Sequence, residues 1–212
     1  MQVLSETQIA RMLALASGTD LYVPILLAVT TGMRRGEILA LTWQDFDPKS
    51  GHLTVTKSLE QTKEGLTVKA PKTAKGRRTI PLPAITVQAL KRHKAEQGRR
   101  RLRLGALYQE LGLICAGPDG SHQEPDSFSQ RFQIFLKKTD LPHIRLHDLR
   151  HTHATQLLKQ GVHPKVVAER LGHSSIAITL DTYSHVVPGL QEEAARQLDR
   201  VLKKAIRESK VY

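Results

Sequence analysis

Apolar residues recur at helical spacing over most of the chain. Segment 5–8 has the pattern of a capping box, and the apolar residues that follow it share one helical face: Ile9, Met12, Leu13 and Ala16. Similar patterns predict further helices over 20–31, 35–41, 85–103, 126–138, 147–160, 164–171, 174–183 and 189–206. The chain is therefore expected to be mainly helical.

Residues 52–82 follow a different pattern. Short β-type runs, with turn residues between them, occupy 53–55, 66–68 and 79–80. They predict a small antiparallel sheet of about three strands. Because no internal repeat and no long polar linker interrupts the chain, we expect residues 1–212 to form a single mainly α domain (α+β), with this sheet at about 52–82 and a C-terminal helix at about 189–206.

The sequence is strongly basic. It has 32 Lys and Arg against 20 Asp and Glu, which gives a formal net charge of +12 and a pI of about 10.0. Such a surface attracts a polyanion, DNA or RNA. The longest apolar stretch, 21–29, is too short to span a membrane, and no signal-peptide pattern is present, so we expect no membrane partner. One Trp, four Tyr and four Phe are few for a protein that stacks single-stranded bases on aromatic platforms.

Cys115 is the only cysteine in the chain. A lone cysteine excludes an intramolecular disulfide and a zinc knuckle, and it fits the reducing cytoplasm. Its neighbours in 113–116 are apolar, so we expect a buried, unreactive thiol rather than a nucleophile.

The first candidate cluster for chemistry is 31–39. Gly32 precedes Arg34 at the start of a predicted helix, which lets the guanidinium approach a phosphate with two parallel hydrogen bonds. Glu37 follows three residues later on the same helical face and could hold Arg34 in position. The alternative is a solvated Arg–Glu pair on an ordinary helix.

The second cluster, 71–82, predicts a basic hairpin tip between two strands. A lysine there, such as Lys72, could reach a phosphate or protonate a leaving oxygen. The alternative is a charged turn that keeps the sheet soluble.

The third cluster, 146–154, places His147 and Arg150 at i and i+3, on one helical face. An imidazole beside a guanidinium suits the stabilisation of a pentavalent phosphate. The alternative is a zinc site, since His147 and His151 lie at i and i+4 with His143 and His153 nearby. No Glu accompanies the pair as it does in helical zinc hydrolases, so the phosphate site is favoured.

The fourth cluster combines a Gly-His turn with a tyrosine ten residues later. His173 follows Gly172 at a predicted turn between helices, and Tyr183 lies among polar residues rather than in an apolar stripe. The alternative for Tyr183 is an ordinary core aromatic residue.

The four clusters together resemble the tyrosine recombinases, also called the phage integrase family. The family's motifs appear in order: G-x-R-x-x-E at 32–37, a lysine before R-x-h-P-L at 78–82, H-x-L-R-H-T-x-A at 147–154, L-G-H-S-S at 171–175 and T-x-x-T-Y-S-H at 179–185. Each motif is weak alone, but the ordered set is specific. The resemblance implies a tyrosine recombinase catalytic-domain fold and the breaking and rejoining of duplex DNA.

The resemblance also implies a role for each motif residue. Tyr183 would attack the scissile phosphodiester and form a 3′-phosphotyrosine, while Lys72 would be the general acid for the departing 5′ oxygen. Lys69 and Lys75 lie in the same region, and only the Pro-Lys-Thr context selects Lys72. His147 would assist as a base or as a hydrogen-bond partner to the tyrosine and the phosphate. Arg34 and Arg150 would bind the non-bridging oxygens, His173 would donate to one of them, and Glu37 would support the pocket.

For partners, the resemblance implies double-stranded DNA and no metal ion, ATP or other cofactor. It implies a tetramer on DNA with the C-terminal segment exchanged between subunits, and a monomer when free. Relatives usually carry another, N-terminal DNA-clamping domain, which we expect to be absent here. Candidate phosphate contacts are Arg77, Arg78, Arg99, Arg100 and Arg101. The alternatives are a DNA-binding accessory protein of the same fold, a type IB topoisomerase and, last, a metal-dependent nuclease.

Overall fold

The computed structural model describes residues 2–70, 76–183 and 190–209, and most of them are helical. The helices are α1 (Glu6–Ala16), α2 (Tyr22–Thr31), α3 (Arg35–Ala40), α4 (Ala84–Leu104), α5 (Pro125–Lys137), α6 (Leu146–Lys159), α7 (Pro164–Leu171), α8 (Ile176–Tyr183) and α9 (Leu190–Ser209). Short 3-10 turns lie at Trp43–Asp45 and Gly105–Leu107. The predicted fold class, mainly α with a small antiparallel β part, is confirmed.

The strands pair differently from the expectation of one sheet. The strands are β1 (Phe46–Asp47), β2 (His52–Val55), β3 (Ser58–Thr62), β4 (Gly65–Lys69) and β5 (Arg78–Pro81). They form a three-stranded sheet in the order β1-β2-β5 and a separate β3-β4 hairpin, all antiparallel. The run expected at 66–68 lies in β4, whereas β3, in which only Leu59 is buried, has no apolar alternation and was not predicted. The basic segment before β5 therefore connects two sheets and is not a hairpin tip.

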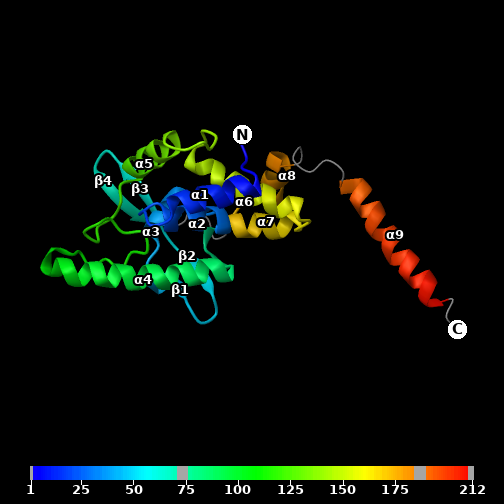
Figure 1. Cartoon of the computed structure of the whole chain (residues 1–212), viewed down its shortest axis with the longest axis horizontal. Helices are drawn as coiled ribbons and strands as arrows, with labels where there is room; N and C mark the ends of the chain where they lie inside the picture. Colours follow the sequence, from blue (N-terminus) through cyan, green and yellow to red (C-terminus); the bar gives the residue numbers. More distant parts are fainter. Residues whose placement is uncertain (1, 71–75, 184–189, 210–212) are drawn as a thin grey trace.

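Helix α2 is the centre of the packing. It contacts α1, α4 and α6, and nearly all of its side chains are buried. The predicted capping box opens α1: Ser5 Oγ accepts from the Gln8 amide at 3.2 Å, and Gln8 Oε1 accepts from the Ser5 amide at 2.9 Å. In Figure 1, α4 runs along one side of the molecule, with its C-terminal end pointing away from α6, α7 and α8.

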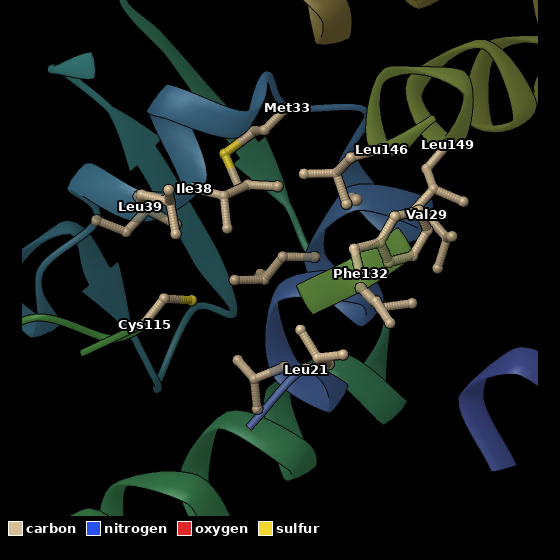
Figure 2. Close-up of a cluster of buried hydrophobic side chains, with 14 of the residues drawn as sticks. Leu21, Val29, Met33, Ile38, Leu39, Cys115, Phe132, Leu146 and Leu149 are labelled. Carbon is tan, nitrogen blue, oxygen red and sulfur yellow. The ribbon is translucent and has the colours of Figure 1, made fainter. Parts of the chain in front are cut away.

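One hydrophobic core holds these elements together. Figure 2 shows side chains from several elements meeting there, among them Met33, Phe132 and Leu149. Full burial of a side chain of this size contributes about 1.5–3 kcal/mol. Cys115 belongs to this core and is 2% exposed, and burial raises the pKa of its thiol to about 12. The expectation that Cys115 is buried is confirmed.

Helix α9 differs from the other helices because it stands apart from them (Figure 1). Its apolar side chains are more than half exposed: Leu198, Val201, Leu202 and Ile206. Within the described residues, no helix combines the length and apolar character needed to cross a membrane.

Candidate active site

The residues predicted to bind a phosphate line one pocket. Its volume is about 570 Å³, and it lies where the first turns of α3 and α6 meet the turn between α7 and α8 and strand β3. The predicted residues in its lining are Arg34, Glu37, His147, Arg150 and His173. They come from three distant stretches of sequence, and the fold brings them to one place.

Arg34 lies at the N-cap of α3 and is held by Glu37. Its amide donates to Glu37 Oε2 at 2.8 Å, and its Nη1 donates to Oε1 at 3.0 Å. The Arg34 side chain is 47% exposed, whereas that of Glu37 is 4% exposed. The carboxylate therefore holds the amide and the Nη1 of Arg34, and it leaves part of the guanidinium facing the pocket.

Glu37 has a second partner that the sequence did not predict. Arg78 of β5 donates from Nη1 to Glu37 Oε1 at 3.0 Å and from Nη2 to Oε2 at 2.8 Å. Burial alone would raise the pKa of Glu37, but hydrogen bonds and charge from Arg78, followed by those from Arg34, outweigh it and keep the pKa below its ordinary value. The carboxylate between the two arginines is thus ionised.

Arg150 is held by main-chain carbonyls. Its Nη1 donates to Gly32 O at 2.6 Å and its Nη2 to Leu171 O at 2.8 Å, and the residue is 3% exposed. Gly32 ends α2 with φ +67°, and a Cβ there would lie 2.5 Å from Leu171 Cδ2 and 2.7 Å from His153 Cδ2. The glycine is therefore required by the turn and this close packing, and its carbonyl positions Arg150.

His147 enters the pocket from the first turn of α6. Asp148 beside it caps this helix, because its Oδ2 accepts from the Arg145 amide at 2.8 Å. Partial burial and then the charge of Arg150 lower the pKa of His147. Sequence reasoning considered His151 only as a zinc ligand, yet it lines the same pocket, with its ring 4.8 Å from that of His147. The i, i+4 spacing was the signal for this shared face.

His173 enters the pocket from the turn between α7 and α8. Gly172 ends that helix with φ +68° and turns the chain toward the pocket. The Nδ1 atom of His173 is 2.8 Å from Thr179 Oγ1, which fixes the ring. Burial lowers the pKa of His173 to about 4, helped by the charges of Arg150 and Arg34. The imidazole is therefore neutral near pH 7 and can donate one N–H.

The predicted general acid and nucleophile are only partly within the described structure. Lys72 lies outside the described residues, but the residues that flank its segment, Ala70 and Gly76, both line the pocket. Tyr183 is the last residue of α8, and its side chain lies outside the description. Its neighbour Thr182 lines the pocket as well. Described residues next to both predicted residues thus line this site.

Of the two rivals of Lys72, only Lys69 is described. It lies at the end of β4, where its Nζ is 2.9 Å from Glu60 Oε2. This cross-strand ion pair engages the Lys69 ammonium group, and the choice of Lys72 as the general acid stays a prediction. Lys75 lies outside the described residues.

The predicted DNA contacts fall into different environments. Arg78 is wrongly placed among them, because its side chain is 7% exposed and is bound to Glu37 rather than available to a phosphate. Arg77 is exposed next to the site. The other three, Arg99, Arg100 and Arg101, lie in the last turns of α4, whose C-terminal end points away from α6, α7 and α8 (Figure 1), and none of them lines the pocket.

Further cavities adjoin the pocket on two sides. One of about 720 Å³ shares Arg34 and His147 and continues past Arg145, whose side chain is 77% exposed. Another of about 590 Å³ lies on the far side of His173 and is lined by Arg77 and Lys165. Basic residues therefore flank the pocket in both directions.

The alternative zinc site lacks ligands in the described part of the chain. No group of three His, Cys, Asp or Glu side chains there is arranged to hold a metal ion. His147 and His151 lie close together, but His153 is buried with its Nδ1 2.9 Å from Val29 O, and His143 is exposed.

Comparison with known proteins supplies relatives. Residues 2–189 match the phage integrase family. A tyrosine recombinase XerC-like protein of Caldanaerobacter subterraneus subsp. tengcongensis is 31% identical over 210 residues, which are 93% of this chain and 54% of that protein. The ICEBs1 integrase of Bacillus subtilis is 36% identical over 176 residues, which are 83% of this chain and 48% of that protein. The chain thus spans about half the length of these curated relatives.

Solved structures share the fold. The Tn1549 transposon integrase, in complex with transposon right end DNA, matches with a TM-score of 0.79 at 24% identity, over 95% of this chain and 66% of that one. The catalytic domain of bacteriophage HP1 integrase matches with a TM-score of 0.56 at 24% identity, over 92% of this chain and 94% of that one. With the family match over nearly its whole length, the chain belongs to the phage integrase family and has the fold of a tyrosine recombinase catalytic domain.

Proposed function

We propose that this chain is the catalytic domain of a site-specific DNA recombinase or integrase that cuts and rejoins duplex DNA through a 3′-phosphotyrosine at Tyr183. The observation that carries the proposal is the pocket that gathers Arg34, His147, Arg150 and His173; described residues close in sequence to Lys72 and Tyr183 also line it. Family membership and the tyrosine recombinase and integrase names of the relatives support the same activity.

In the proposed reaction the Tyr183 oxygen attacks the scissile phosphorus while the bond to the 5′ oxygen breaks. Lys72 gives a proton to the departing 5′ oxygen, and His147 takes the proton of the tyrosine. A 5′-hydroxyl from a partner strand then attacks the phosphotyrosine, which reverses the proton transfers and seals the strand. The tyrosine ester retains the energy of the phosphodiester, so rejoining needs no ATP.

The proposed transition-state stabilisation comes from cations and neutral donors. Arg34 and Arg150 bind the non-bridging oxygens of the phosphate, where negative charge grows as the pentavalent state forms. The lowered pKa of His173 keeps its imidazole neutral, so it serves as a hydrogen-bond donor rather than as a charge. In this scheme the side chains supply the positive charge that many phosphoryl-transfer enzymes take from a divalent cation.

We further propose that duplex DNA crosses the pocket along the two flanking cavities. Arg145 would lie near the backbone on one side, and Arg77 and Lys165 on the other. The net charge of +12 favours this, because each neutralised phosphate releases counterions. The Tn1549 integrase structure that shares this fold contains transposon end DNA.

For assembly, we propose a tetramer on DNA in which α9 binds a neighbouring subunit, and a monomer in the absence of DNA. The exposed apolar residues of α9 recur at helical spacing and would bury their surface on such a neighbour. Sedimentation of the free chain and of its DNA complex measures both states.

A nicked suicide substrate tests the catalytic proposal. The duplex carries the protein's own attachment site, recovered from the sequence that flanks its gene, and is labelled on the 5′ side of the cut. Incubation in EDTA should give a protein-linked DNA band on a denaturing gel, and Tyr183→Phe should lose it. Tight binding to a verified site without the band would point to an accessory DNA-binding protein. In a separate assay, relaxation of a supercoiled plasmid without strand exchange would point to a topoisomerase.

A further inference from the structure

Arg78 occupies the junction of three parts of the active site. Its guanidinium makes two hydrogen bonds to Glu37, at 3.0 and 2.8 Å, and its Nε donates to Arg170 O at 2.7 Å. Nη1 also donates to Gly76 O at 3.2 Å. One side chain thus joins α3, the last turn of α7 and the residue that follows the segment of Lys72.

The Glu37 carboxylate passes this constraint to Arg34. Each Glu37 oxygen accepts one hydrogen bond from Arg78 and one from Arg34, so the three groups form a chain of charge-assisted bonds. Glu37 is 4% exposed and the Arg78 side chain 7% exposed, so water scarcely competes with their pairing. The position of the more exposed Arg34 therefore depends on a buried pair behind it.

Arg78 also lies against the turn that carries His173. A Cβ at Gly172 would lie 2.9 Å from Arg78 Nη1, so the guanidinium fills the space that a side chain would need there. Gly172 has φ +68°, a conformation that favours glycine. The turn before His173 therefore packs directly against the Arg78 guanidinium.

We infer that Arg78 is a positioning residue for strand cleavage, which holds Arg34 through Glu37 and supports the turn before His173 without touching the DNA. The inference rests on the proposed function, since Arg34 must bind the scissile phosphate for its position to matter. A displacement of about 1 Å in a catalytic group lowers a rate by about 100-fold. We expect an effect of this size from Arg78→Met.

A neutral phosphate separates positioning from folding. Replacing one non-bridging oxygen of the scissile phosphate by methyl removes the negative charge that Arg34 meets, so the exact position of Arg34 matters less. Single-turnover strand cleavage is measured on the nicked site with the ordinary phosphate and with the methylphosphonate. Arg78→Met should lose about 100-fold on the phosphate and less than about 10-fold on the methylphosphonate.

Two further variants distinguish a loss of positioning from a loss of folding. Removal of one partner of a buried ion pair is strongly destabilising, so Arg78→Lys is the companion variant. It keeps the charge but lacks the planar fork that reaches Glu37 and Arg170 O together, and it should show the same selective loss. Arg131→Met is the matched control, because Arg131 bridges Asp20 and Gln123 outside the pocket, and its rates on the two substrates should fall equally or not at all.

The outcomes are distinct. Failure of the unchanged protein to cleave the ordinary site would overturn the proposed function and this inference with it. Cleavage by the unchanged protein, with folded Arg78 variants that lose the same factor on both substrates or nothing on either, would overturn the inference alone. A loss confined to the charged phosphate would establish it.

Discussion

The first turn of α6 forms one wall of the pocket and the first turn of α3 forms another. The two walls hold their arginines by different means. On the α6 wall, Arg150 is 3% exposed and donates to the main-chain carbonyls of Gly32 and Leu171. On the α3 wall, Arg34 is 47% exposed and depends on Glu37, which is itself held by another side chain. The first arginine is fixed by the fold, and the second by a relay of side chains.

This difference has consequences for sensitivity to mutation. Carbonyl groups at the ends of α2 and α7 cannot be removed by substitution, so these two hydrogen bonds of Arg150 are lost only when the backbone moves. The place of Arg34 changes when any member of the relay is replaced. In the proposed reaction, the phosphate would therefore meet one rigidly held arginine and one adjustable arginine.

The largest expected effect is a loss of cleavage rate, and single and double substitutions test whether such losses add. Removing one group that stabilises transition-state charge costs about 100- to 1,000-fold in rate, and we expect Arg150→Met to lose this factor in both the unchanged protein and Glu37→Gln. Arg34→Met should lose a similar factor in the unchanged protein but clearly less in Glu37→Gln, where Arg34 is already displaced. Single-turnover cleavage of the nicked site measures all five variants. Equal losses for Arg34→Met in both backgrounds would contradict the relay.

Acid stability tests how the α6 wall is anchored. His153 of α6 is 5% exposed, its Nδ1 lies 2.9 Å from Val29 O, and burial lowers its pKa to about 4. In the unfolded chain the ordinary value is about 6.5, so below that pH the unfolded state takes up a proton that the folded state refuses until about pH 4. The free energy of unfolding should therefore fall as the pH drops from 7 to 4, by about 3 kcal/mol from this residue.

Urea titrations at each pH measure this change. His153→Gln removes the titrating group while retaining a donor for Val29 O, so its stability should fall less steeply with acid than that of the unchanged protein. Parallel curves for the two proteins would show that His153 does not anchor the wall through its neutral form.

Most of the fold could be predicted because its helices carry local signals. The capping box at Ser5 and the helical spacing of apolar residues are written in short windows of sequence. Of the β3-β4 hairpin, only β4 could be predicted, from the alternation of Leu66 and Val68, since β3 has a single buried residue and lacks an apolar alternation. Tertiary pairing, rather than local pattern, decides where such strands lie.

The residues of the candidate site also divide into those that local spacing predicts and those that only the tertiary structure reveals. Arg34 and Glu37, or His147 and Arg150, are neighbours in sequence, so their spacing could reveal them. The role of Arg78 could not be predicted, because its partners Glu37 and Arg170 are 41 and 92 residues away. Its basic neighbourhood suggested a DNA contact, and only burial shows that its charge is used inside the protein.

The smallest expected effect on stability comes from an arginine at the start of the α6 wall. The side chain of Arg145 is 77% exposed and pairs with Asp148. The cap of the helix is the hydrogen bond from the Arg145 amide to Asp148, and any residue except proline provides this amide. Arg145→Met should therefore lower the urea midpoint of unfolding only slightly, because the Asp148 carboxylate, whose side chain is 6% exposed, keeps its hydrogen bond to the backbone amide of residue 145. It should weaken DNA binding at all sequences and reduce the salt dependence of log K by about one phosphate contact. A large loss of stability would show that the α6 wall, like the α3 wall, depends on side-chain pairing.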